Sequence, residues 1–509
     1  MKKKLFLFLT LHLIFLFSFA QREGDAWYYG TLFDVNLSFT DSMNYLIVDE
    51  NNLLNEYNTY TDIRRTHSNT SICDSTGQVI IYSYGRAIYD ANHQVINNGD
   101  SIFGAINFPE FYYDALAQQV QDVLMLPDFK NIKQSNVFHL RTDDPFPPLS
   151  YSEVYVTAIL ETKVVNTDSA YVAIEKAKEL VNMEMERDGI AACRHANGRD
   201  WWLMAVKKDS DCYISCLYTP DTILIEEHCL GIWEPDPIDV EIGISFFSQD
   251  GSKYVVGNYP DGIRVFDFDR CTGMLSNKIE ISYYEIVDSL SLPYFRGSCA
   301  LSNNNRFLYT STYDKLYQFD LQDTNILASK TLLVFNDSLQ ASFDYIFDFN
   351  MINKNGKIYI CSGNFRNIHI IHNPDEKGLA CNVEVKHPLL APGGYALPNH
   401  PNFRLGALTG SACDTLGVGI SYITEGQFSL FPNPAKSLVR VDYGSYYWQG
   451  NENLELTITD VLGKEVFTRK IERFSAYQDI NVSSFTKGVY LVLLLSDKGL
   501  IHQEKLLVE

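Results

Sequence analysis

The chain has 509 residues, of which 46% are hydrophobic and 13% aromatic, and its formal net charge is -22 at pH 7. At about 150 residues per domain, this length fits either several domains or one large repeat architecture with additions. Such an acidic surface repels nucleic acid and anionic lipid, so we exclude both as partners. The high aromatic content favours strands over helices.

The first residues predict a cleavable signal peptide. The basic start Lys2–Lys4 precedes an apolar run from Leu5 to Phe17, and the small residues Ser18 and Ala20 follow it. This run is shorter than the roughly 20 residues that span a bilayer, so a retained anchor is the less favoured alternative. We therefore expect signal peptidase to remove residues 1–20.

A recurring order of turn, strand, turn and aromatic strand accounts for most of Trp27 to Pro398. Four copies begin at Ser75, Asp250, Asn303 and Lys354. The last three are about fifty residues apart, which is the size of a four-stranded propeller blade. The pattern predicts an all-β protein in which residues 21–405 form a seven-bladed β-propeller, with six blades as the alternative. An array of β-sandwiches is the competing architecture.

Two segments within this region leave alternatives open. We expect the N-terminal strand near Trp27–Phe39 to complete a blade with the C-terminal end and so close the ring. The segment Tyr171–Asp188 is rich in helix formers and stops at Gly189. The repeat predicts a strand plus a loop there, and a short helix is the alternative.

The ten cysteines show neither the paired C-x-x-C spacing of a zinc site nor a redox motif. An oxidising destination permits disulfides, but the spacing assigns no pairing. Cys212 and Cys216 lie four apart in a strand-like run, so their side chains face the same side of the strand. We expect several of the others to be small buried apolar groups.

The stretches His195–Trp202 and Val265–Asp269 resemble signature segments of secreted β-propeller proteins from Bacteroidetes. This family is related to WD-repeat-like and lactonase-like propellers. The likeness continues through Leu397-Pro398-Asn399 and is strongest after Gly189. It implies a fold more than an activity, because WD-type blades use such His and Asp residues to bind turns to strands. The signature residues with an expected structural role are His195, Asn197, Gly198, Asp200, Trp201, Asp267 and Asp269.

The C-terminal residues carry a second set of motifs. Their alternating pattern predicts a small antiparallel β-sandwich. Their order resembles the type A sorting domain of type IX secretion cargo, which implies a sorting domain at residues 429–509 after a linker at 406–428. The resemblance also implies recognition by the outer-membrane translocon and removal by a sortase. The motif residues are Phe431, Pro432, Asn433, Pro434, Asp460, Gly463, Lys464, Gly488, Tyr490 and Lys505.

Motifs for catalysis are absent from the sequence: it has no nucleophile elbow, no H-E-x-x-H helix and no phosphate-binding loop. Asp267 and Asp269 resemble the start of a calcium loop, but Thr272 replaces the required Gly and Lys278 the required Glu. We therefore predict no catalytic, cofactor-binding or metal-binding residue and no cofactor. The scattered residues His369, His372, His387 and His400 are interpreted as surface or core groups.

These observations favour an exported protein, delivered through the periplasm and then secreted or held at the outer-membrane cell surface. The first hypothesis is a non-enzymatic propeller whose loops bind an extracellular glycan or protein. The alternative is a lactonase-like or other hydrolase, which needs carboxylates, Asn or His from several blades to converge on the central channel. A structural component of the envelope is the third possibility.

Overall fold

The computed structural model describes residues 26–30, 42–48, 54–60, 68–74, 79–83, 85, 87–102, 121–128, 134–143, 155–167, 170–187, 189–220, 222–231, 242–259, 261–286, 298–312, 314–336, 347–353, 355–361, 367–388, 398–414, 429–442, 454–460, 463–471, 477–496 and 499–508. The predicted signal peptide at 1–20 lies outside these residues. Over the described ranges, we find no helix that has both the length and the apolar character needed to cross a membrane.

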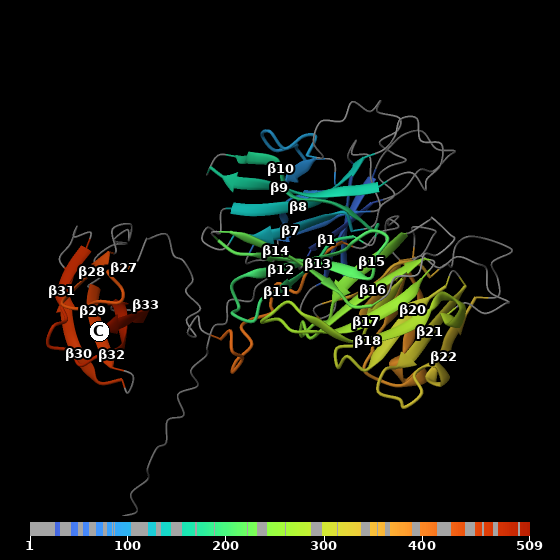
Figure 1. Ribbon diagram of the computed structural model, residues 1–509. Coiled ribbons are helices and arrows are strands. Elements are labelled where there is room, and N and C mark those ends of the chain that lie inside the picture. Colours follow the sequence, from blue (N-terminus) through green and yellow to red (C-terminus); the bar gives the residue numbers. More distant parts are fainter. Residues whose placement is uncertain are drawn as a thin grey trace, which may run out of the picture. The chain divides into compact units, whose positions relative to one another are not determined.

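The described residues form nine sheets joined by antiparallel pairing, which confirms the prediction of an all-β chain (Figure 1). Helical structure in the same ranges is limited to α2 (Tyr283–Ile286), η2 (Leu327–Ser329) and η3 (Gly378–Cys381). Two compact units divide the chain, one with β1 to β26 and one with β27 to β33.

The first unit begins with two three-stranded sheets and a four-stranded sheet. The first sheet contains β1 (Ala26–Gly30), β2 (Ser42–Val48) and β3 (Leu54–Tyr60), and the second contains β4 (Thr70–Cys73), β5 (Val79–Ser83) and β6 (Ile88–Asp90). The third contains β7 (Val123–Pro127), β8 (Gln134–Asp143), β9 (Tyr155–Asn166) and β10 (Tyr171–Met185).

Four further four-stranded sheets follow, each a meander in chain order. The fourth contains β11 (Ala191–Arg194), β12 (Trp201–Val206), β13 (Cys212–Tyr218) and β14 (Ile223–Cys229), and the fifth β15 (Ile242–Phe247), β16 (Lys253–Tyr259), β17 (Gly262–Phe268) and β18 (Leu275–Ser282). The sixth contains β19 (Cys299–Leu301), β20 (Phe307–Ser311), β21 (Lys315–Asp320) and β22 (Thr331–Phe335), and the seventh β23 (Asn350–Ile352), β24 (Ile358–Cys361), β25 (Asn367–Ile371) and β26 (Val383–Pro388).

Neighbouring sheets of the first unit meet through their first strands and through their faces. Strand β1 contacts β4, β4 contacts β7, β11 contacts β15 and β19 contacts β23. One buried apolar cluster joins the fifth and sixth sheets, with Val255 and Phe319 among its members. Similar clusters join the second to the third, the fourth to the fifth and the sixth to the seventh. The fifth and sixth sheets each take part in two of these clusters, so they bury apolar residues on both faces, as stacked blades require.

The turns between the first and second strands are built alike, which explains the repeat seen in the sequence. Ser248 N–H donates to Lys253 O at 3.0 Å, and Ser302 N–H donates to Phe307 O at 2.9 Å. Each turn also needs one residue with positive φ, and Asn305 at 56° takes the place that Gly has in the neighbouring turns. Asn is one of the few residues with a side chain that tolerates this conformation.

Two local expectations are revised. Strand β1 pairs with β2 instead of with a C-terminal strand, and no described residue after β26 joins a sheet of this unit. The segment rich in helix formers is one long strand, β10 (Tyr171–Met185), paired with β9 through several register shifts. The predicted strand is confirmed, but it continues where a loop was expected, and the alternative short helix is not formed. The ladder with β9 outweighs the weak helix propensity of these residues.

The second unit is a small sandwich. Its three-stranded sheet has the order β27 (Ser429–Phe431), β28 (Leu438–Asp442), β31 (Tyr477–Asn481), and its four-stranded sheet has the order β30 (Glu465–Lys470), β29 (Leu454–Asp460), β32 (Gly488–Ser496), β33 (Gly499–Val508). One core contains residues from both sheets, including Val439, Ile458 and Val492. The predicted antiparallel arrangement is confirmed for the described strands.

Candidate functional site

A small cavity lies where the first strands of the fourth to seventh sheets approach one another, and we call it the central cavity. It encloses about 70 Å³, which is enough for a few water molecules. Its lining comes from Ala191–Ala192, Ile244–Phe247, Cys299–Ala300, Asn350–Ile352 and the single residues Gln121 and Gln249, together with residues 398–402. Residues from four sheets and from the segment 398–402 therefore line this one cavity.

Residues 398–402, which we call the clasp, connect the third and fourth sheets through the side chain of Asn399. The Asn399 amide donates to the carbonyl oxygens of Ile190 at 2.7 Å, Val123 at 3.2 Å and Gln121 at 3.4 Å. These acceptors belong to the third and fourth sheets or precede their first strands. Asn399 is only 5% exposed, so its hydrogen bonds are formed away from water.

The backbone of Asn399 extends the same contact to the second sheet. Its N–H donates to Asn69 O at 2.8 Å, and Thr70 Oγ1 donates to its carbonyl oxygen at 3.0 Å. The next residue, His400, accepts a hydrogen bond at Nε2 from Ser71 N–H at 3.1 Å. Burial lowers the pKa of His400 to about 3, so its imidazole is neutral and can accept through Nε2.

The polar lining of the central cavity is mostly amide and hydroxyl. It consists of Gln121, Ser245, Gln249, Asn350, Asn399, His400 and Asn402. Within the described lining there is no carboxylate, and the clasp already uses the side chain of Asn399. Ser245 Oγ and Asn350 Nδ2 have no protein partner among the described residues, so ordered water is the natural partner for both.

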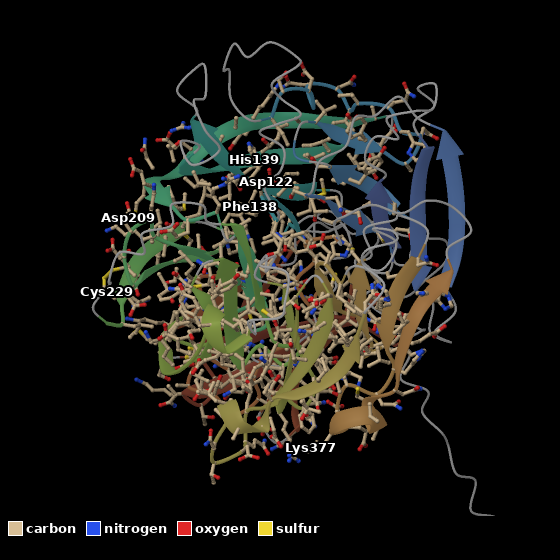
Figure 2. All side chains as sticks on the ribbon, turned by 90° about the vertical axis from the view of Figure 1, so that its right-hand side faces the viewer. Asp122, Phe138, His139, Asp209, Cys229 and Lys377 are labelled. Carbon is tan, nitrogen blue, oxygen red and sulfur yellow. A yellow bond between two sulfur atoms is a disulfide. The ribbon has the colours of Figure 1, made fainter. Side chains whose placement is uncertain are left out.

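One carboxyl group next to the cavity lining is strongly perturbed. Asp122 directly follows Gln121 and is 5% exposed, and burial raises its pKa to about 7, although a hydrogen bond from Ser68 opposes the shift. Its Oδ1 has no partner among the residues described by the structure. Figure 2 shows Asp122 inside the unit, near His139 and Phe138. Sequence reasoning missed Asp122 because no motif surrounds it.

The signature residues of the fourth sheet take part in hydrogen bonds and packing. His195 Nε2 lies 3.0 Å from Cys271 O, and its ring lies 5.6 Å from that of Trp202. Trp201 is fully buried, with the guanidinium of Arg194 stacked 3.9 Å from its ring centre. The His195 contact joins the fourth sheet to a turn of the fifth, whereas the Arg194–Trp201 contact lies within the fourth sheet.

The turn after β11 holds the next three signature residues. Asn197 Oδ1 accepts from the N–H groups of Arg199 at 2.9 Å and Asp200 at 3.0 Å. The Asp200 carboxylate accepts from Asn197 Nδ2 at 2.7 Å and pairs with Arg199. Gly198 has φ of 75°, and a Cβ on it would lie 2.6 Å from Ala407 N. Asn197 and Asp200 therefore use their polar atoms within this turn.

The two signature carboxylates of the fifth sheet also have local partners. Asp267 pairs with Lys253 on the neighbouring strand and accepts from Asn277 Nδ2 at 2.6 Å. Asp269 Oδ1 accepts from Cys271 N–H at 2.8 Å, which closes the turn into β18. The two carboxylates thus have separate local partners, Asp267 within the sheet and Asp269 in the turn into β18.

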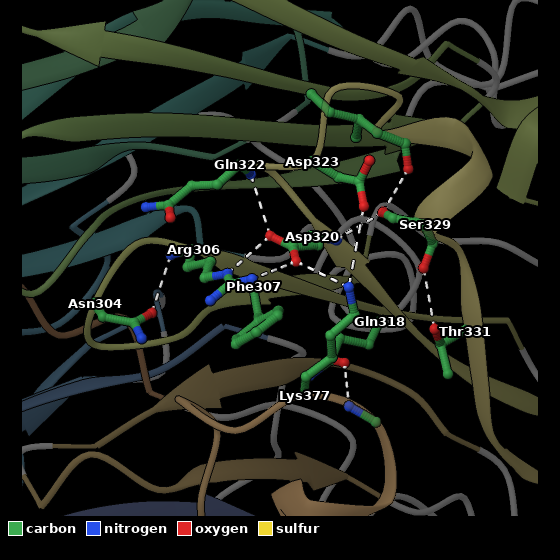
Figure 3. A network of polar contacts seen from close by, with 12 residues as sticks. Asn304, Arg306, Phe307, Gln318, Asp320, Gln322, Asp323, Ser329, Thr331 and Lys377 are labelled. Carbon is green, nitrogen blue, oxygen red and sulfur yellow. Dashed lines mark hydrogen bonds and ion pairs between the residues drawn. The ribbon is translucent and has the colours of Figure 1, made fainter.

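Figure 3 shows a polar network that connects the sixth and seventh sheets around Asp320 at the end of β21. Arg306 donates twice to its carboxylate, at 2.9 and 2.8 Å, and Lys377 Nζ donates at 3.1 Å. Ser329 Oγ accepts from the Asp320 N–H at 2.8 Å. Hydrogen bonding by Arg306 and Lys377 holds the pKa of the Asp320 carboxyl well below its usual range.

We expect Asp320→Asn to lower the free energy of unfolding by about 2–3 kcal/mol at neutral pH, because charge-assisted hydrogen bonds to a buried carboxylate are lost. The expected loss of free energy stays small because the side chains of Arg306 and Lys377 are 41% and 54% exposed and can be solvated by water. A depressed pKa contributes stability above the unfolded pKa, and this contribution is lost as pH falls through the folded pKa. Urea unfolding at pH 7 and pH 3 measures both effects, and Asp323→Asn is the control. An equal loss at both pH values would contradict this account.

A histidine pair that looked scattered in the sequence meets at one carboxylate. Glu384 lies 2.7 Å from His372 Nε2 and 2.9 Å from His387 Nδ1. A bulge places Glu384 and His387 on the same side, with Lys386 at φ of 68° and its N–H donating to His369 Nδ1. The two imidazoles lower the pKa of Glu384. Sequence reasoning missed this cluster because a bulge is not visible in a period-two pattern.

The sorting-motif residues of the second unit lie at the points where its strands join. Asn433 Nδ2 donates to Lys505 O at 2.7 Å, and Leu507 N–H donates to Asn433 Oδ1 at 2.9 Å, so Asn433 fastens the Phe431–Pro434 segment to β33. Its neighbour Ala435 donates to Leu507 O at 2.8 Å. Hydrogen bonds therefore fix the motif segment Phe431–Pro434 to the final strand, β33.

The other motif residues shape turns. Lys464 N–H donates to Asp460 Oδ1 at 2.9 Å, and Gly463 has φ of 80° in the turn between β29 and β30. Tyr490 is buried and donates through its hydroxyl to Thr486 O at 2.7 Å. Gly488 begins β32, which carries Tyr490 into the core.

Comparison with known families decides what this unit is. Residues 429–509 match the family described as "Secretion system C-terminal sorting domain". The second unit is a sorting domain. This domain belongs to the type IX secretion system and implies export to the cell surface or beyond, with interaction with the secretion machinery. No curated protein sequence matches the chain.

Solved structures share the fold only distantly. A Bacteroides uniformis protein named as a 6-phosphogluconolactonase is 12% identical, with 73% of this chain and 98% of that chain covered and a TM-score of 0.44. A periplasmic gluconolactonase from Pseudomonas aeruginosa is 11% identical, with 73% and 98% covered and a TM-score of 0.36. A β-propeller domain from Myceliophteria thermophila is 11% identical, with 64% and 88% covered and a TM-score of 0.32. With TM-scores under 0.5, these likenesses carry no argument about activity.

Proposed function

We propose that the protein is an exported, seven-bladed β-propeller that binds an extracellular ligand, a glycan or a protein, after its sorting domain has delivered it through the type IX translocon. The support for the blade number is that the first unit has seven sheets and that buried clusters join four pairs of neighbouring sheets among the second to the seventh. Signal peptidase and a sortase are the processing partners. We place the propeller at 21–405 and the linker at 406–428.

The observation that supports the binding role most directly is the set of chemical groups that line the central cavity. A metal-dependent hydrolase needs several acidic or imidazole ligands that point to one position. Here the described lining offers amide and hydroxyl groups, and the clasp uses Asn399 and His400 for internal hydrogen bonds. Ligand recognition is then left to the loops of the propeller, which a rigid scaffold holds in place.

The binding role is tested with the full mature chain. We expect it to retain a defined glycan or surface protein from its own cell envelope, with no turnover of lactone or ester substrates. Asp122, the perturbed carboxyl group beside the cavity lining, is the one observation that favours the hydrolase instead. Turnover that Asp122→Asn abolishes, with binding unchanged, would replace the binding role with the hydrolase.

The sorting role predicts the fate of a truncated chain. Deletion of Leu430–Glu509 is expected to leave the propeller in the periplasm, because the translocon then has no domain to recognise. Immunoblots of periplasmic, surface and medium fractions measure this outcome. Asn433→Ala is expected to cause a partial defect through the loss of its two hydrogen bonds to β33. Normal surface delivery of the truncated chain would overturn the sorting role.

A further inference from the structure

The disulfide Cys212–Cys229 joins the third and fourth strands of the fourth sheet. Cys212 begins β13 and Cys229 ends β14, and the two residues lie directly opposite each other in the ladder. Cys229 is exposed, and Figure 2 shows it at the edge of the unit. A solvent-accessible disulfide can be reached by an attacking thiolate.

A carboxylate lies beside the two sulfur atoms. Glu227 is two residues before Cys229, so both side chains project from the same face of β14. Glu227 Oε1 lies 3.6 Å from Cys229 Sγ, and single ligand atoms of Cys212, Glu227 and Cys229 all lie within 4.8 Å of one another. No other such group of three was found among the described residues.

A lysine lies beside this group. Lys207 Nζ lies 2.7 Å from Glu227 Oε1. Two thiolates and one carboxylate carry three negative charges, which a divalent cation and Lys207 would balance. An ammonium group nearby also favours the thiolate form of a cysteine. The local charge therefore fits one divalent ion.

The remaining cysteines do not offer a comparable site. Six are buried and form no disulfide: Cys73, Cys193, Cys216, Cys299, Cys361 and Cys381. Burial raises the pKa of Cys193 and of Cys216 to about 12, so their thiols stay protonated. Cys271 and Cys413 are also disulfide-bonded. Among the described residues, Cys212 and Cys229 are thus distinguished because they form a group of three possible ligand atoms with Glu227.

We propose that Cys212, Glu227 and Cys229 form a site for a thiophilic divalent cation such as Zn²⁺ when their disulfide is reduced. A small dithiol supplies two electrons: the Sγ–Sγ bond breaks, each sulfur takes one proton, and the dithiol becomes its own disulfide. The cation then displaces both thiol protons and binds two thiolates and the Glu227 carboxylate, the ligands that zinc prefers. Water takes the fourth position.

The oxidation state then decides whether the cation can bind. In the disulfide form neither sulfur is a thiolate, so only Glu227 remains as a ligand. An exported chain reaches an oxidising environment, where the disulfide form prevails. The site is therefore open before oxidation of the chain or after contact with an extracellular dithiol.

The test uses the full mature chain and Cd²⁺ alone as the probe. We expect the dithiol-reduced chain, freed of reductant, to bind one Cd²⁺ and to show thiolate-to-cadmium charge-transfer absorbance, whereas the oxidised chain shows none. Glu227→Gln should weaken the affinity for Cd²⁺ by at least roughly tenfold. Loss of a residue that only supports a ligand already costs that much, and Glu227 is proposed as a ligand itself. Glu226→Gln is the matched control, because residue 226 projects from the opposite face of the same strand.

Two further variants keep the test decisive. If reduction unfolds the original chain, the test uses a Cys271→Ser/Cys413→Ser chain. This chain retains Cys212–Cys229, so reduction breaks that disulfide and leaves the rest of its covalent structure unchanged. A Cys212→Ser/Cys229→Ser chain reports binding elsewhere. The proposal is overturned if reduced chains bind no more Cd²⁺ than this last variant, or if Glu227→Gln binds as tightly as the original sequence.

Discussion

Replacement of Asn399 by alanine is expected to lower the free energy of unfolding of the propeller unit by about 2–4 kcal/mol, because buried carbonyl groups lose their donor. The amide of Asn399 reaches Ile190 O at 2.7 Å and Val123 O at 3.2 Å, and no water can easily replace it at 5% exposure. Alanine keeps the backbone hydrogen bond to Asn69. The predicted loss therefore belongs to the side chain, and urea unfolding of the mature chain measures it.

Two variants sharpen this prediction. Asn399→Asp should cost more than alanine, because a carboxylate cannot donate and would be buried beside carbonyl oxygens. Asn92→Ala is the control, because Asn92 is an exposed turn residue. If Asn399→Ala and Asn92→Ala unfold at the same urea concentration, the clasp does not stabilise the sheets and its contacts are incidental.

The sheets could be predicted from sequence because their determinants are local. The turns beginning at Ser248 and Ser302 use the same hydrogen bonds, so the residue types that form them recur at a regular spacing. Apolar residues on both faces of strands such as β17 and β20 showed that the sheets must stack. Blade-like organisation follows from these two features alone.

The clasp could not be predicted in the same way. Thr70 and Asn399 are 329 residues apart, and a single hydrogen bond between them leaves no periodic signal. Sequence reasoning noticed Pro398-Asn399 only as part of a resemblance, and it expected strand exchange with the N-terminal strand instead. The structure pairs β1 with β2 and joins sheets through the clasp. Long-range side-chain contacts of this kind are visible only in three dimensions.

The sorting domain was predicted more completely than the propeller site. Its motif residues define turns and the connection between Asn433 and β33, so sequence and structure carry the same information. The Glu384 cluster shows the opposite case, since a bulge at Lys386 brings His387 to the carboxylate. Regular strands can be predicted from a sequence pattern. The position of a bulge and the burial of a carboxyl group depend instead on packing in three dimensions.

Asp122→Asn is expected to stabilise the protein at high pH and to change its pH dependence. Burial raises the pKa of Asp122 to about 7 in the folded state, against about 4 for an unfolded chain. A raised carboxyl pKa contributes stability at low pH, and this stability is lost as pH rises from the unfolded to the folded pKa. Over this range the original chain should lose about 4 kcal/mol relative to the Asn variant, at about 1.4 kcal/mol per pH unit.

Urea unfolding of both chains between pH 4 and pH 8 measures this difference, and other titrating groups cancel in the comparison. The difference should grow up to about pH 7 and then stay constant, because Asp122 is ionised in both states above that value. Asp100→Asn is the control, since the ion pair of Asp100 with Lys176 lowers its pKa and leaves it exposed. A constant difference across the range would mean that Asp122 is already ionised when folded. Its burial beside the cavity lining would then need an unrecognised cation to balance it.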